Sequence, residues 1–309
     1  QSDFKAGEYN TVVVGFETEH EQGSSYLSSD SAFGPFDTSF GERSQHNNAG
    51  FLEDQLIYGE HVGATFGIRI DDNSKSGSEV TWKAAPSYLI VESGTRLKGS
   101  VGTGFKAPSL FQLYSEFGRQ DLQPEESLGW DVGLEQQLPE GIIVDVTYFR
   151  NEFDNLINFD PGTFIFENIA EAETSGFEAV LRYKFMENGV LRAVYTYTDS
   201  EDNITGMSLL RRPKNKYALG ARFSPAQGWN IDISCAYYGP RFDNDFSTFP
   251  AQRVKLGGYT LYNVAASYDI TENLELFVRG ENLSDKEYEE VFGFGEPGLA
   301  IYGGVRLHT

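Results

Sequence analysis

Segments in which apolar and polar residues alternate run along the whole chain, and this alternation is the feature that most constrains its fold. In segment 142–148, Val144 and Val146 lie on one side while Asp145 and Thr147 lie on the other. A period of two residues is typical of a β-strand with two unlike faces. The pattern therefore predicts an all-β protein, and it leaves open which solvent the apolar faces meet.

About fourteen such strands are predicted in succession. Many reach the roughly 9–11 residues that a tilted strand needs to cross a bilayer, and they exceed the usual length of about 5–6 residues in soluble proteins. The predicted strands cover residues 9–20, 45–59, 61–71, 79–92, 94–105, 127–138, 141–153, 165–185, 188–199, 211–224, 227–239, 258–270, 272–283 and 297–307.

The connections between these strands alternate in length. Tight joints are predicted at 59–61, 92–95, 138–141, 186–189, 226–229 and 271–273, and longer ones at 21–44, 72–78, 106–126, 154–164, 199–210, 240–257 and 284–296. Outer-membrane barrels combine short periplasmic turns with long external loops, and their strands alternate between lipid and lumen. An antiparallel transmembrane β-barrel is therefore predicted. A soluble propeller is disfavoured, because no repeat of about 40–50 residues is visible.

Composition narrows the partners and the chemistry. The net charge of -22 disfavours nucleic acid, whose phosphates demand a basic surface. No run of about 18 apolar residues is present, so no transmembrane helix is predicted. The four histidines stand in no H-E-x-x-H spacing and no G-x-S-x-G segment occurs, which argues against an enzyme. Cys235 is the single cysteine and is predicted to be a small apolar side chain on the lipid face.

Two segments on either side of one long joint carry a recognisable pattern. GTGFKAPSLFQLY at 102–114 and DLQPEESLGWDVGLE at 121–135 resemble the signature of TonB-dependent outer-membrane receptors, in which a strand ends in F-K-A-P and L-x-P-E-x-S leads into the next strand. Three further segments are similar to patterns of that family: NIAEAETSGFEA at 168–179, LLRRPKNK at 209–216 and ENLSDKEYEE at 281–290.

The resemblance implies an architecture and a location. It implies that residues 1–309 form one barrel domain in the cell outer membrane. The domain would be either the C-terminal fourteen or so strands of a 22-strand receptor barrel or a smaller closed barrel. The family's plug domain, through which TonB is contacted, is not expected within these residues. The lipid bilayer and lipopolysaccharide are the expected surroundings.

The segment YYGPRFDNDFSTFPAQRVKLGGYTLYN at 237–263 is most similar to the vitamin B12 (cobalamin) receptors of that family. This likeness implies uptake of cobalamin or a related corrinoid, with an iron–siderophore complex as the other ligand class, energised through TonB in the complete protein. A passive, plugless diffusion channel is the alternative.

Candidate ligand contacts lie in the predicted external loops. Phe111 and Tyr114 offer flat apolar surface to a corrin-like or siderophore ligand, although packing within their own loop is the alternative role. Arg211 and Arg212 are candidates for bidentate hydrogen bonds to ligand amides or phosphate, with a structural role as the alternative. The candidates suggested by the cobalamin-receptor likeness are Arg241, Phe246, Phe249 and Arg253.

Three acidic segments qualify by composition as calcium ligands: 70–73, 198–203 and 242–246. Calcium prefers several oxygen ligands at close range, but none of these segments matches an EF-hand loop. A solvated acidic surface, or divalent bridging to lipopolysaccharide, is the favoured interpretation. No resident cofactor or metal is predicted, and loop-bound calcium is the only exception considered.

Overall fold

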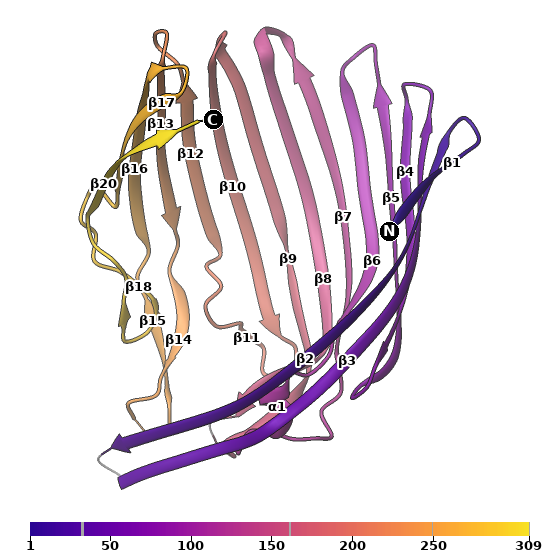
Figure 1. The fold of residues 1–309 in the computed structure, drawn as a ribbon, viewed down its shortest axis with the longest axis vertical. Coiled ribbons are helices and arrows are strands. Elements are labelled where there is room, and N and C mark those ends of the chain that lie inside the picture. The colour runs from indigo at the N-terminus through magenta and orange to yellow at the C-terminus, as the bar shows by residue number, and fades with distance from the viewer. Residues whose placement is uncertain (32–33, 161, 249, 309) are drawn as a thin grey trace.

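A computed structural model describes residues 1–31, 34–160, 162–248 and 250–308. Its main feature is one curved antiparallel sheet of sixteen strands, in which neighbours along the chain are neighbours in the sheet (Figure 1). The fourteen long strands are β2 (Asn10–Ser31), β3 (Gly34–Tyr58), β4 (Val62–Asn73), β5 (Gly77–Ile90), β6 (Thr95–Lys106), β7 (Glu125–Leu138), β8 (Ile142–Asp160), β9 (Ile165–Met186), β10 (Gly189–Asp202), β12 (Asn215–Phe223), β13 (Trp229–Tyr238), β16 (Tyr259–Thr271), β17 (Leu274–Glu281) and β20 (Ala300–Leu307).

Six short elements complete the sheet and its two small hairpins. Two of them belong to the main sheet: β1 (Ser2–Ala6) pairs with β2, and β11 (Met207–Ser208) pairs with β10. The others form two hairpins, β14 (Arg241–Asp245) with β15 (Gln252–Leu256), and β18 (Glu289–Val291) with β19 (Phe294–Gly295). The helical residues described are α1 (Leu110–Tyr114) and a 3-10 turn at Pro139–Gly141. No helix among the described residues is long and apolar enough to cross a membrane.

The all-β architecture and the succession of fourteen long strands confirm the prediction, with three corrections. The edge strand β1 was not predicted. Residues 21–44 were predicted to be a loop, but β2 and β3 pair from Asn10↔Leu56 to Ser31↔Gly34 and form one long hairpin. The joint at 154–164 is shorter than predicted for the same reason, since β8 and β9 pair as far as Asp160↔Ile165.

The two ends of the sheet differ as the joint lengths predicted. Six tight turns, between β3 and β4, β5 and β6, β7 and β8, β9 and β10, β12 and β13, and β16 and β17, lie together at the top of Figure 1. We call this the turn end. The opposite end, here called the loop end, holds α1, the hairpins β14–β15 and β18–β19, and the tip of β2–β3 (Figure 1).

The sheet is a partial barrel. Its pairing order runs from β1 to β20 as a path with two ends, and no pair among the described residues joins those ends. In Figure 1 the two edge strands stand well apart on either side of the wall. A barrel closed by fourteen strands, one of the two predicted forms, is therefore not what these residues adopt.

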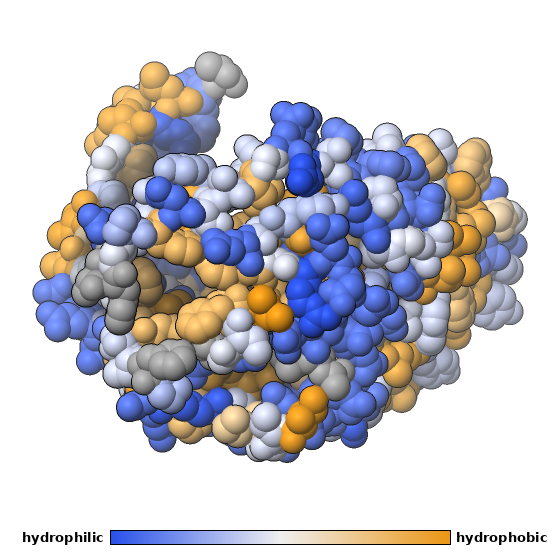
Figure 2. Space-filling view, turned by 90° about the horizontal axis from the view of Figure 1, so that it is seen from below, coloured by the Kyte–Doolittle hydropathy of each residue, from blue (hydrophilic) through white to orange (hydrophobic). Residues whose placement is uncertain are grey.

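Along each strand, successive side chains point to opposite faces of the sheet, one of which is apolar and the other polar. Leu181, Leu219 and Cys235 line one groove that is almost wholly apolar, whereas Asp145 and Arg182 line a polar cavity. Asp145 is held there by Lys98 at 2.5 Å. Figure 2, viewed toward the loop end, shows apolar atoms along the outer flank of the wall. The alternation in the sequence therefore corresponds to two physically different faces.

A belt of aromatic rings crosses the apolar face. Trp130 contacts Tyr148 with ring centroids 5.5 Å apart, and Tyr148 is paired in register with Phe177. The belt continues from Phe177 to Tyr195 at 5.4 Å and through Tyr217 to Tyr237 on β13. Aromatic girdles of this kind mark the interfaces of membrane barrels, because the rings combine an apolar body with a polar edge.

Candidate ligand-binding site

A cationic cavity of about 270 Å³ lies on the polar face at the loop end. Three of its residues are held side by side by the sheet, since Lys216 on β12 pairs with Tyr238 on β13 and Tyr238 pairs with Tyr259 on β16. The remaining lining comes from the connection before β12 and from neighbouring loops. The lining residues are Arg211, Arg212, Pro213, Lys216, Tyr238, Arg241, Tyr259, Glu290 and Val291.

The buried carboxylate of Asp243 holds three loop segments together beside this cavity. Asp243 is fully buried, and its oxygens accept hydrogen bonds from the backbone N–H of Phe292 at 2.8 Å and of Asn244 at 2.9 Å, and from Arg211 Nε at 2.9 Å. Burial alone would raise the pKa of Asp243, but these two N–H groups and the Arg211 guanidinium together lower it below its ordinary value. Asp243 is therefore a structural anion that ties β14 to the β18–β19 hairpin.

Arg211 adopts a backbone conformation that a long side chain rarely takes. Its φ is 58°, in the left-handed region, which costs roughly 1–2 kcal/mol for a residue that is not glycine. Two contacts hold it there: its N–H donates to the carbonyl of Phe242 at 2.7 Å, and its guanidinium reaches Asp243. Strain of this kind persists where the surrounding structure over-determines it, and it concentrates at functional sites.

Arg241 is buried and fully engaged. It donates to the backbone carbonyls of Glu289 at 2.6 Å and of Glu290 at 3.3 Å, and its guanidinium lies 5.2 Å from the centroid of the Tyr259 ring. Tyr259 in turn donates to Glu290 Oε1 at 2.7 Å and stacks on Tyr288 at 4.2 Å. Burial, reinforced by the charges of Glu296 and Glu290, raises the pKa of Tyr288. This end of the cavity is therefore held by several mutual contacts among Arg241, Tyr259, Tyr288 and Glu290.

The other two cations are free. Arg212 and Lys216 are exposed, and neither makes a side-chain hydrogen bond or ion pair within the described residues. Their charges face a cavity in which Glu290 is the one acidic lining residue, and Glu290 is already hydrogen-bonded to Tyr259. The cavity therefore presents unneutralised positive charge in a chain whose net charge is -22.

Two of the predicted contacts in the β14–β15 hairpin, Phe246 and Arg253, are not part of this cavity's lining, whereas Arg241 is. Arg253 lies 4.6 Å from the centroid of the Phe242 ring and donates to the carbonyl of Ser208, so it braces the hairpin against β11. Phe246 is exposed at the hairpin's tip. Phe249 lies outside the described residues. Of the predicted arginines, Arg211, Arg212 and Arg241 come together.

Phe111 and Tyr114 lie on α1, across the loop end from the cationic cavity. Phe111 makes edge contacts with Phe40 and Phe166 at about 6 Å, in an aromatic cluster that continues through Phe159. Tyr114 has the charges of Arg43 and Lys75 over its ring at 5.2 and 5.5 Å. Both side chains thus contact other segments of the loop end rather than their own loop, and Phe111 remains 43% exposed. A ligand contact at either residue stays a prediction.

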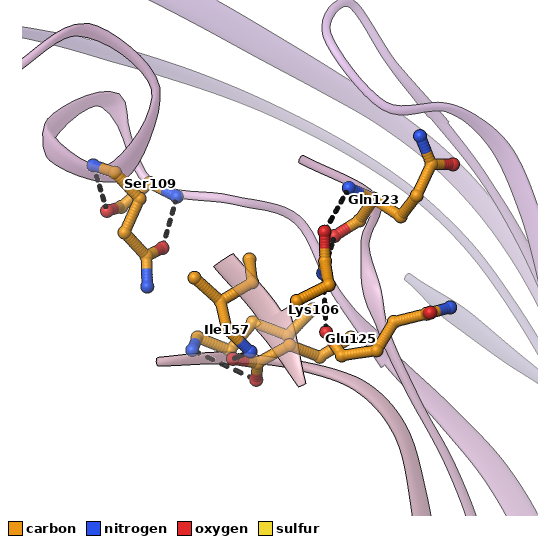
Figure 3. Close-up of polar contacts among 8 residues, drawn as sticks. Lys106, Ser109, Gln123, Glu125 and Ile157 are labelled. Carbon is orange, nitrogen blue, oxygen red and sulfur yellow. Dashed lines mark hydrogen bonds and ion pairs between the residues drawn. The ribbon is translucent and has the colours of Figure 1, made fainter. Parts of the chain in front are cut away.

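The recognisable motif around α1 is a set of local hydrogen bonds (Figure 3). Ser109 caps α1 through a reciprocal pair of bonds with Gln112. Glu125 accepts from Lys106 Nζ at 3.1 Å and from the backbone N–H of Ile157 at 3.0 Å. The motif residues therefore join the ends of β6, β7 and β8.

The motif also joins the segment before β7 to β9. The backbone of Gln123 exchanges two hydrogen bonds with the side chain of Asn168 on β9, at 2.9 and 3.0 Å. Residues of this motif thus anchor the long loop between β6 and β7 to the wall.

In the acidic segments considered for calcium, several carboxylates already interact with other groups of the protein. Asp243 is satisfied as described, and Asp202 accepts from the backbone N–H groups of Ile204 and Thr205. Asp199 forms an ion pair with Lys214 at 2.6 Å. No group of three or more histidine, cysteine or carboxylate side chains placed to hold a metal ion occurs in the part of the chain that the structure describes.

Sequence reasoning missed Lys216, Tyr238, Tyr259 and Glu290. The alternation of faces carried a signal for the first three, since they occupy polar-face positions toward the loop ends of predicted strands. Glu290 lies in the long joint before β20, where no period indicates a facing.

Comparison with known proteins defines the family. The model of the family described as "TonB dependent receptor-like, beta-barrel" matches residues 1–283. Among solved structures, the siderophore receptor PirA from Acinetobacter baumannii is 19% identical, with a TM-score of 0.77 over 99% of this chain. The ferric-catecholate import receptor Fiu from E. coli K12 is 15% identical, with a TM-score of 0.78 over 100% of it. The copper transporter OprC is 17% identical, with a TM-score of 0.73 over 98%.

These similarities concern the fold. The chain spans about half the length of the structures that it matches, covering 53% of PirA, 53% of Fiu and 55% of OprC. The three names cover a siderophore, a ferric catecholate and copper, so a wall of this shape is compatible with different cargoes. The choice of ligand has to be argued from the residues of this chain.

Proposed function

Since the chain belongs to the TonB-dependent receptor-like β-barrel family, we propose that it forms part of the wall of an outer-membrane receptor that captures an anionic iron chelate at its loop end. Receptor barrels of this family are outer-membrane transport proteins. The observation that carries the ligand class is the pair of free cations, Arg212 and Lys216, in a cavity that Arg211 and Arg241 also line. Uptake energised through TonB is proposed for the complete receptor.

The electrostatics of the cavity favour an anion over a neutral ligand. Two carboxylates adjoin these cations: Asp243 is paired with Arg211, and Glu290, the acidic residue of the lining, accepts a hydrogen bond from Tyr259. Four cationic residues line the cavity, so its net charge stays positive. A charge-assisted hydrogen bond to an unpaired guanidinium or ammonium contributes about 1.5–3 kcal/mol. A ferric siderophore with net negative charge can form such a charge-assisted hydrogen bond with both Arg212 and Lys216. A neutral ligand forms only ordinary, weaker hydrogen bonds with them.

A corrinoid is the second candidate, and it rests on the 237–263 segment. The structure gives several residues of that segment a role within the protein: Arg241 and Asp243 are buried and bonded, and a side chain at Gly239 would meet the carbonyl oxygen of Asn215 at 2.9 Å. A pattern fixed by such contacts is compatible with receptors for different ligands. Among the described residues of this segment, Phe246, exposed at the tip of the hairpin, is one that remains available to a corrin ring.

A binding experiment separates the two candidates. The protein is purified in detergent and titrated with ferric enterobactin and, separately, with cyanocobalamin. Arg212→Ala and Lys216→Ala are each expected to weaken binding of the ferric chelate about tenfold, with a loss that shrinks as salt is raised. Lys255→Ala, an exposed cation of the same loop end outside the cavity, is the matched control and should change little.

Two outcomes would overturn the proposal. Binding of cyanocobalamin without affinity for any ferric chelate would replace the iron assignment by the corrinoid one. Equal losses for Arg212→Ala and Lys255→Ala would show that the cavity has no special role and that the chelate responds to the overall potential of the loop end.

A further inference from the structure

A second cavity on the polar face, of about 410 Å³, has the opposite character. It lies where β2 to β6 approach the loop end, and its lining is rich in oxygen acceptors. Two pairs of facing residues form one wall: Glu19 lies opposite Asn47, and Glu21 lies opposite Gln45. Directly opposed side chains have Cβ atoms about 5 Å apart, and residues two apart on a strand are about 7 Å apart. The four side chains therefore form a compact square.

Two amide oxygens in this square are buried and lack a donor. Gln45 is 8% exposed, and neither its Oε1 nor Asn47 Oδ1 has a hydrogen-bond partner within the described residues. A buried acceptor left unpaired costs about 1–3 kcal/mol, so the native protein is expected to supply a partner. Both residues line the cavity, and we expect the partner to come from there.

Neighbouring carboxylates fix which way each amide points. Gln45 Nε2 donates to Glu21 Oε2 at 2.5 Å, and Asn47 Nδ2 donates to Asp71 Oδ1 at 2.7 Å. Rotating either amide by 180° would place its oxygen against a carboxylate oxygen. The orientation is thus determined by the hydrogen-bond network, and it leaves the oxygens of Gln45 and Asn47 as acceptors.

The one arginine of the cavity is already neutralised. Arg69 is held by both oxygens of Asp71 at 2.9 and 2.8 Å, and it reaches Glu17 at 3.2 Å. Glu19 is exposed and makes no ion pair or side-chain hydrogen bond within the described residues. Glu19 and Glu21 therefore contribute negative charge that no cation of the described chain balances directly.

We propose that the square of Glu19, Glu21, Gln45 and Asn47 binds a calcium ion on the polar face at the base of the β2–β3 hairpin. Calcium accepts six to eight oxygen ligands in an adaptable geometry and combines carboxylate with amide oxygens. The four side chains supply the two carboxylates and two amide oxygens, and water completes the shell. The 70–73 segment contributes Asp71 only indirectly, by orienting Asn47.

A calcium ion at this position would stabilise the part of the β2–β3 hairpin that extends beyond the wall. Beyond this square, β2 and β3 leave the wall and cross the loop end as a two-stranded ribbon (Figure 1). A two-stranded ribbon is marginally stable by itself. An ion that joins the two strands where they leave the wall reduces the freedom of the ribbon, including Arg43, which lies opposite Gly23 just beyond the square.

The experiment uses the purified protein, freed of lipopolysaccharide and of divalent ions, and titrates it with calcium chloride by calorimetry. We expect one binding event with a dissociation constant between about 10⁻⁵ and 10⁻³ M. Glu19→Gln, Glu21→Gln and Gln45→Met should each weaken it about tenfold or more. Glu60→Gln and Gln22→Met, outside the square, are the matched controls. Glu19→Gln also guards against misfolding, because Glu19 has no partner to lose.

Tryptic cleavage after Arg43 supplies a second readout, because residues 6–58 contain no other lysine or arginine. Calcium should slow this cut in the parent protein and in both controls but not in Glu21→Gln. Three results would overturn the proposal: no calcium-dependent heat up to about 10 mM, equal losses in the controls, or tighter binding of magnesium than of calcium. The first result would leave water as the partner of the two amide oxygens.

Discussion

Replacing Asp243 by asparagine tests whether one buried carboxylate organises the loop end. In the native protein Oδ1 accepts from Asn244 N–H and Arg211 Nε, while Oδ2 accepts from Phe292 N–H. Asparagine keeps one oxygen, which can serve the first two donors. Its NH₂ group must then face the N–H of Phe292, so that one hydrogen bond is lost and two donors oppose each other.

The magnitude follows from these three bonds. A hydrogen bond to a charged group contributes about 1.5–3 kcal/mol, and a donor left unsatisfied in a buried site costs about 1–3 kcal/mol. Arg211 is partly exposed, with 44% of its side-chain surface accessible, so solvent screens the loss of its charged partner and that term is small. The local free energy that holds β14–β15 against the β18–β19 hairpin should fall by about 2–3 kcal/mol.

Hydrogen exchange measures this locally, whereas melting of the barrel wall should not change. A loss of about 2–3 kcal/mol corresponds to an acceleration of about 30- to 150-fold in the exchange of amides in β14 and β15. Asp245→Asn on the same hairpin is the matched control, since Asp245 accepts one hydrogen bond, from Ser247 N–H. Equal protection of β14–β15 in the parent and Asp243→Asn proteins would refute the assignment of Asp243 as the organising anion.

The pH dependence has a definite sign. The pKa of Asp243 is lowered in the folded protein, so the folded state binds this proton less readily than the unfolded state. The stabilisation is therefore complete above the unfolded pKa of about 3.9 and is lost as the pH falls through the lower folded value. Protection of β14–β15 should be flat from neutral pH to about pH 4 and should decline below it.

Two further predictions concern the wall. Ile233→Arg, at the centre of β13 on the apolar face, should cost about 2–4 kcal/mol in lipid, whereas Ser234→Arg on the polar face should cost far less; unfolding titrations in liposomes measure both, and equal costs would refute the facing. Gly176→Ala should reduce the folded yield, because a Cβ there would lie 1.9 Å from the carbonyl oxygen of Tyr197, while Gly50→Ala, with nothing within 4 Å, should fold normally; heat-modifiability on gels compares the two.

The wall was predictable because lipid imposes a simple code. Where a strand has hydrocarbon on one side and water on the other, every second residue is constrained. The predicted strands at 79–92 and 188–199 accordingly match β5 and β10 to within about three residues. The tight joints were predictable for a related reason, since a turn of two to five residues leaves room for few other arrangements.

The ribbon beyond the wall was not predictable by the same rule. Residues 21–31 of β2 read EQGSSYLSSDS, which has no apolar period, because this part of the hairpin has no lipid on either side. Its strands are specified by their mutual backbone hydrogen bonds, which depend little on side-chain type; the proline of the ribbon, Pro35, lies near its tip, opposite Asp30. For the same reason β14–β15 and β18–β19 were predicted only as parts of long loops.

The cationic cavity shows which part of a site a sequence pattern reveals. Arg211, Arg212 and Arg241 were selected as similar arginines, yet their roles differ: Arg241 is buried and donates to two backbone carbonyls, and Arg211 is paired with Asp243. Only Arg212 keeps its charge free, and the second free cation, Lys216, was missed. The positive charge of the site could be predicted from residue type. Which cations remain unpaired could not, because their partners lie in other loops, about 30 to 50 positions away in the sequence. Substituting Arg212 or Lys216 should therefore weaken ligand binding directly, through lost contacts with the ligand. Substituting Arg211 or Arg241 should weaken it indirectly, because these side chains hold the neighbouring loops in place.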